Sequence, residues 1–163
     1  MLNDQFPRST PMGQTFTFAA TLASNQRGAL EHLLYFNVNQ QRVRLGIQKS
    51  IESYGVPEIV EKDGRLSIRV GSLECIETLF AVSEFGHPLG VAIFAQSTPE
   101  RVLVLHLGVL PRLRSASEVN TQVLLDLVHE VHRLARCREG VDRIEVVYSQ
   151  RQEASKSAAS VSS

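Results

Sequence analysis

Cysteine and long apolar runs are scarce in this chain, and their scarcity excludes several classes of protein. Only two cysteines, Cys75 and Cys137, occur in 163 residues, far apart and outside the C-x-x-C spacing of zinc and redox motifs. We predict reduced, buried thiols without a disulfide framework, and no metal site. No apolar stretch reaches the roughly 18 residues of a membrane helix, and the N-terminus lacks the apolar run of a signal peptide. A cytoplasmic protein that does not act on membranes is therefore expected.

The chain also lacks a net charge. Seventeen Lys and Arg balance seventeen Asp and Glu, so no overall field attracts nucleic acid or an anionic membrane. Four arginines cluster toward the C-terminal end, without interleaved aromatic residues, which is more typical of a solvated face than of an RNA site. These are Arg133, Arg136, Arg138 and Arg143. Nucleic acid is therefore not an expected partner.

What remains is the composition of one globular domain, with 43% hydrophobic and 21% charged residues. Residues 1–14 are polar and interrupted by prolines, so we predict a flexible N-terminal segment. Residues 152–163 are small and Ser-rich, which predicts a disordered tail. A single folded domain is expected over residues 15–151.

Hydrophobic periodicity predicts an α/β sheet flanked by helices. The run VLVLHLGV at 102–109 is apolar at both alternating sets of positions apart from His106, so it predicts a central strand covered on both faces. The N-terminal half is predicted to contain a strand from Thr15, a helix capped by Ser24 or Asn25, and a second or continued helix closed by Gly55. A turn at Asp63 and Gly64 then opens a strand at 66–70. Further strands are predicted at 78–83 and 89–95, followed by an amphipathic helix from Val119 that ends by Gly140 and a last strand at 144–147. In the long helix, Glu130 is predicted to fall opposite an apolar stripe. The stripe consists of Val123, Leu124, Leu127, Val128, Val131, Leu134 and Ala135.

Two segments and the order of the elements resemble the GNAT acyltransferase superfamily. FAVSEFGHPLGVAIF, at 80–94, is similar to the hairpin of that family, with Gly90 near the start of its second strand. GVLPRLR, at 108–114, is similar to the end of the fourth strand and its V-x-P-x-x-R continuation. The resemblance covers about half of the chain and implies a mixed, mostly antiparallel sheet flanked by helices.

The resemblance also implies an acyl-CoA site. In the family the fourth strand splays from the fifth, and its exposed backbone groups bond the pantetheine arm; by position these groups belong here to Leu107, Gly108 and Val109. The pyrophosphate lies at the N-terminus of the next helix, where Arg112 and Arg114 can bind phosphates. An acyl-CoA co-substrate and an unknown amine acceptor are thus implied.

The phosphate loop departs from the family pattern R/Q-x-x-G-x-G/A, because Ser117 and Val119 occupy the glycine positions. Moreover, Ser115 and Glu118 form an S-x-x-E capping box, which places a carboxylate where the pyrophosphate would lie. Two functions therefore stay open. One is an N-acyltransferase; the other is a catalytically silent GNAT-like module for binding or dimerisation.

No catalytic residue is predicted. Leu103 and Leu105 occupy the positions where the family often carries its base, and His106 lies one residue away. Strand alternation points His106 to the opposite face unless a bulge intervenes, so we predict a buried, hydrogen-bonded core histidine. His129 and His132 form H-x-x-H without a third ligand, which predicts a surface position.

After the predicted domain the chain reads EASKSAASVSS, where the family continues with one helix and two strands. Their apparent loss would leave a sheet edge to be covered. We therefore expect a homodimer that shares an exposed strand or helix surface.

Overall fold

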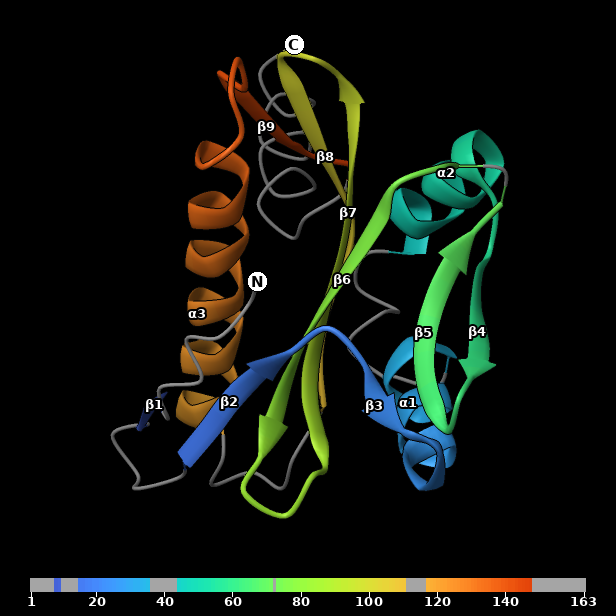
Figure 1. Ribbon diagram of the computed structural model, residues 1–163, viewed down its shortest axis with the longest axis vertical. Helices are drawn as coiled ribbons and strands as arrows, with labels where there is room; N and C mark the ends of the chain where they lie inside the picture. The colour runs from blue at the N-terminus through green and yellow to red at the C-terminus, as the bar shows by residue number, and fades with distance from the viewer. Residues whose placement is uncertain (1–7, 10–14, 36–43, 72, 111–116, 148–163) are drawn as a thin grey trace, which may run out of the picture.

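A computed structural model describes residues 8–9, 15–35, 44–71, 73–110 and 117–147. They form an α/β fold in which a six-stranded sheet lies between α3 (Ser117–Arg136) on one face and a layer of helices and a second sheet on the other (Figure 1). The strand order is β1-β2-β6-β7-β8-β9, and only β8 and β9 are parallel. The strands are β1 (Arg8–Ser9), β2 (Thr15–Ala19), β6 (Ile76–Ser83), β7 (Pro88–Thr98), β8 (Arg101–Val109) and β9 (Arg143–Val146). The mostly antiparallel sheet confirms the sequence prediction, and β8 lies inside the sheet beside the last strand, although as its fifth strand rather than at its centre.

The second sheet has three strands in the order β3-β5-β4. They are β3 (Leu22–Ala23), β4 (Pro57–Lys62) and β5 (Arg65–Val70). Asp63 and Gly64 join β4 to β5 and both have positive φ, at 52° and 72°, as a two-residue type I′ hairpin requires. The sequence predicted this turn and β5 but not β4, because Ile59 and Val60 are adjacent and do not show the alternation of a half-buried strand.

Two helices, α1 (Arg27–Tyr35) and α2 (Arg44–Tyr54), lie in the same layer as this small sheet (Figure 1). Gly55, with φ at 102°, ends α2 and donates its N–H to the carbonyl of Ile51 at 2.9 Å, which confirms the predicted glycine stop. The predicted cap was wrong. A 3₁₀ turn, η1 (Ser24–Gln26), begins there without a side-chain cap, and the Ser24 hydroxyl donates instead to Glu61 Oε1 at 2.9 Å.

Each face of the large sheet carries its own apolar core. On the α3 face, the buried helix residues Val123, Leu127, Val131 and Ala135 pack against β2, β6, β7 and β8, as their helical spacing predicted. On the other face, three leucines of α1 pack with the inward side chains of β5 and with Phe80. Because β8 contributes to both cores, it is covered on both sides.

The prediction that Glu130 falls opposite the apolar stripe of α3 was wrong, because this residue is buried. Its side chain is only 7% exposed, and both of its carboxylate oxygens accept from Arg133 Nε, at 3.2 and 3.1 Å. The ion pair compensates the carboxylate that the helix carries inward.

Both cysteines are exposed, so the prediction of buried thiols was wrong. Cys75 lies just before β6 with φ at 57°, and Cys137 lies directly after α3. In the described ranges, no helix is long and apolar enough to cross a membrane.

Candidate functional site

The parallel strand β9 pairs with only the first part of β8. Arg101 to Val104 of β8 lie opposite Arg143 to Val146 of β9. The last described bond between them runs from the N–H of Val147 to the carbonyl of Val104, at 3.0 Å. β8 then continues to Val109, so its second half extends past the end of β9.

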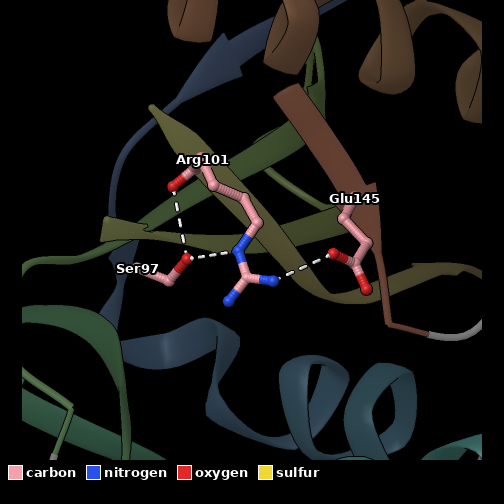
Figure 2. A network of polar contacts seen from close by, with 3 residues as sticks. All are labelled: Ser97, Arg101 and Glu145. Carbon is pink, nitrogen blue, oxygen red and sulfur yellow. Dashed lines mark hydrogen bonds and ion pairs between the residues drawn. The ribbon is translucent and has the colours of Figure 1, made fainter. Parts of the chain in front are cut away.

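A polar network holds the start of this strand pair together (Figure 2). The Arg101 guanidinium donates from Nε to Ser97 Oγ at 3.0 Å and from Nη1 to Glu145 Oε2 at 3.3 Å. The Ser97 hydroxyl in turn donates to the Arg101 carbonyl at 3.4 Å. The network links the ends of β7 and β9 to the first residue of β8, so the strand pair is anchored at the end opposite to Val109.

Past the paired segment, β8 turns backbone groups toward the side on which β9 lies. Leu110 donates its N–H to the carbonyl of Leu89 at 2.9 Å, and Gly90 lies opposite Val109. In an antiparallel pair, residues that bond to the neighbouring strand alternate with residues whose N–H and C=O point away from it. Leu107 and Val109 therefore direct these groups away from β7.

A β-bulge lies between the two halves of β8. Ile93 of β7 lies opposite His106, and the next residue, Phe94, lies opposite Val104. Leu105 is thus the extra residue that bulges from the ladder. The Ser50 hydroxyl of α2 donates to the Leu105 carbonyl at 3.4 Å, which provides a polar contact for this irregular backbone.

The bulge places His106 on the α1 side of the sheet, the same side as Leu105. A Cβ on Gly108 would lie 3.1 Å from His106 Nε2 and 3.7 Å from the carbonyl oxygen of Leu33, so ring and helix occupy one side of the strand. Leu107, by contrast, packs against the α3-side core. The predicted burial of His106 is confirmed. The bulge that the prediction named as an exception is present, so His106 lies on the same side as Leu105 instead of the opposite one.

His106 is a neutral imidazole at physiological pH. Its residue is 6% exposed, and burial lowers the pKa of His106 from 6.5 to about 4, because a charged ring loses its hydration in the apolar interior. A base with so low a pKa binds a proton weakly at neutral pH. The ring is thus a polar group held beside the second half of β8 without a charge.

At two glycine positions near the end of β8, neighbouring atoms leave little room for a larger residue. A Cβ on Gly90 would lie 2.8 Å from Leu127 Cδ1 and 3.1 Å from the carbonyl oxygen of Gly108. On the other side, Gly108 leaves room for the His106 ring. Both glycines therefore permit close packing on the two faces of the sheet at the end of β8.

The outer surface of α3 carries a shallow hollow whose described lining comes from this one helix and its end. His129 is exposed and His132 is partly buried, as residues of a helix surface. Desolvation, with the neighbouring charges of Arg136 and His129, lowers the pKa of His132. Arg133, also in the lining, binds Glu130. In the described part of the chain, no three His, Cys, Asp or Glu residues form a cluster that could hold a metal ion.

The structure brings together only part of the site that the sequence predicted. Leu107, Gly108 and Val109 form the end of β8, whereas Arg112 and Arg114 lie outside the described residues. Glu118 lies in the first turn of α3, and its side chain is likewise outside the description. Sequence analysis missed Ser50, whose only signal was a polar residue in α2, and the bulge at Leu105, for which the sequence carries no signal.

The chain matches no protein-family model, no curated protein and no solved structure.

Proposed function

We propose that this chain is a GNAT-like domain that binds an acyl-CoA along the second half of β8. The observation that supports the proposal is the unequal length of two parallel strands: β8 continues through a bulge to Val109, while β9 ends at Val146. An extended thioester arm could add to β8 as a further strand does, through main-chain hydrogen bonds. Leu107, whose backbone groups point to that side, would bond it next to the strand end at Val109.

The phosphates would lie beyond the end of β8, toward the start of α3. Arg112 and Arg114 follow β8 in the sequence and would supply guanidinium groups for them. The N-terminus of α3 adds backbone N–H groups that favour an anion. If Glu118 caps the helix, its carboxylate competes for the same N–H groups, so we expect weak binding.

Acyl transfer to an amine would additionally need a base and groups that hold the oxyanion. His106 is the nearest described titratable residue to the bulge, and it is neutral and buried. A second function, a catalytically silent GNAT-like module, is favoured by this one observation, because an imidazole with a pKa of about 4 is a poor base for an amine near neutral pH.

Amide chemical shifts of the ¹⁵N-labelled protein test the proposed site. Acetyl-CoA should shift the amides of Leu107 and Val109, and acetyl-pantetheine, which lacks the nucleotide, should reproduce those shifts. Adenosine 3′,5′-bisphosphate should instead affect the segment between β8 and α3. Shifts confined to the outer surface of α3, or none at millimolar ligand, would refute the β8 site.

Release of free thiol from acetyl-CoA in the presence of mixed amines separates the two versions. An enzyme releases thiol only when an amine is present, whereas the silent module binds acetyl-CoA without releasing thiol. His106→Asn is the matched variant: it keeps a neutral polar side chain, so unchanged turnover in this variant would remove His106 from the candidates for the base.

A further inference from the structure

The small sheet ends in an edge strand at the outer side of the molecule. β4 is the terminal strand of the order β3-β5-β4, and Figure 1 shows it on the side of β5 that faces away from the large sheet. In the described part of the chain, no strand pairs with β4 on this outer side. Edge strands of this kind offer backbone groups to a further strand.

The hairpin turn determines which residues of β4 face outward. With a two-residue turn at Asp63 and Gly64, the flanking residues Lys62 and Arg65 form a hydrogen-bonded pair. Alternation along the ladder then directs the backbone groups of even-numbered β4 residues to β5, and those of Ile59 and Glu61 outward. The Tyr35 hydroxyl agrees with this assignment, because it donates to the carbonyl of Pro57, another odd-numbered residue.

On one face of the small sheet, the side chains of β4 form a self-complementary series. Glu58, Val60 and Lys62 share this face, because they alternate along one strand. Val60 is a half-buried apolar residue between two exposed residues of opposite charge, of which Glu58 also accepts from Arg69 Nη2 of β5 at 2.8 Å. In an antiparallel pair of two copies centred on Val60, each Glu58 would lie opposite Lys62 of the other copy.

We propose that β4 is a dimerisation edge, and that its partner is β4 of a second copy of this chain, paired antiparallel about Val60. The pairing joins the two small sheets into one six-stranded sheet. Ile59 of each copy exchanges two backbone hydrogen bonds with Glu61 of the other. The two Val60 side chains meet at the two-fold axis, about 4.5 Å apart at Cα as in other non-hydrogen-bonded pairs. The proposal is independent of the acyl-CoA site.

Neighbouring registers are less favourable, which makes the pairing specific. A pair centred on Glu61 places two carboxylates directly opposite each other, and like charges in this position are destabilising. A pair centred on Ile59 requires Pro57 to bond to Glu61 of the other copy, but proline has no N–H. The register about Val60 avoids both problems and pairs opposite charges on each side of the axis.

Charge reversal tests the register without relying on loss of function. Glu58→Lys places two lysines opposite each other on both sides of the axis in its homodimer, and Lys62→Glu places two glutamates there, so each variant alone should dimerise about tenfold more weakly or worse. An equimolar mixture restores opposite charges at both positions and should form a heterodimer as stable as the wild-type dimer. Sedimentation at tens of micromolar protein, with circular dichroism to verify folding, measures these states.

A second pair of variants tests the backbone bonds. Glu61→Pro removes an outward N–H, a change that edge strands tolerate, and should give a folded monomer. Glu61→Ala loses the same side chain and its contact with Ser24 but keeps the N–H, so it should remain a dimer. A monomeric wild type, a mixture that does not reassociate, or a dimer that survives Glu61→Pro would each overturn the proposal.

Discussion

The N–H of Val147 bonds to the carbonyl of Val104 at 3.0 Å, just before the residue at which β8 bulges. β9 thus ends beside the point at which β8 changes the alternation of its backbone groups. The bulge changes which β8 backbone groups point away from β7, from even-numbered residues before it to Leu107 and Val109 after it. This relationship gives the end of β8 a backbone edge on which an extended ligand can bind.

His106 should make stability depend on pH. Burial lowers the pKa of His106 to about 4 in the folded protein, whereas an unfolded chain has a value near 6.5. Between these values the unfolded state binds more protons, so the free energy of unfolding should fall as the pH falls from 6.5 to 4, by about 3 kcal/mol in total. Urea titrations at several pH values measure it.

His106→Leu is the control for that dependence, because it removes the titrating group while carboxylates continue to titrate. The difference between wild type and variant should therefore change across this pH window and be constant above it. Parallel curves for the two proteins from pH 7 to pH 4 would contradict a buried neutral imidazole.

Arg133→Ala should destabilise the protein by about 1–3 kcal/mol, since it leaves the buried carboxylate of Glu130 without its guanidinium donor. Arg136→Ala removes the same charge from an exposed position and should change the free energy of unfolding by less than about 0.5 kcal/mol. Equal effects of the two substitutions, measured by urea denaturation, would argue against a special role for the Glu130 pair.

Two glycines should respond in opposite directions to alanine. Gly90→Ala introduces a Cβ 2.8 Å from Leu127 and should destabilise by about 1–3 kcal/mol through overpacking. Gly28 lies in α1 with nothing within 4 Å of a new Cβ, so Gly28→Ala should stabilise by up to about 1 kcal/mol through helix propensity. Thermal unfolding of both variants distinguishes crowding from backbone effects.

Acetyl-CoA should bind more weakly than about 100 μM, because the Glu118 carboxylate is expected to compete for the helix N-terminus. Calorimetry at low salt should show tighter binding for Glu118→Gln and no measurable binding for Arg114→Ala. Micromolar affinity in the unmodified protein, together with acetyl transfer to an amine, would show that the protein is an N-acyltransferase and not a catalytically silent module.

Local patterns predicted the elements whose burial repeats along the chain. The stripe Val123, Leu127 and Val131 defined the buried face of α3, and the continuous apolar run of β8 indicated a strand covered on both sides. These predictions hold because a side chain's face follows from the helix or strand period alone. Glu130 lies three residues after Leu127 and seven after Val123, so the helical period itself puts it at the edge of this face, and the ion pair with Arg133 makes its burial tolerable.

The sequence by itself determined the α/β class, the strand β8 that is covered on both faces and the turn at Asp63 and Gly64, because each follows from periodicity or from backbone preferences of neighbouring residues. Tertiary structure alone decided the bulge at Leu105, the side on which His106 lies and the pairing of β4. A bulge depends on the register between two strands, and a strand such as β4 depends on the partner that supplies its hydrogen bonds. These contacts join residues distant in the chain, so no short segment encodes them.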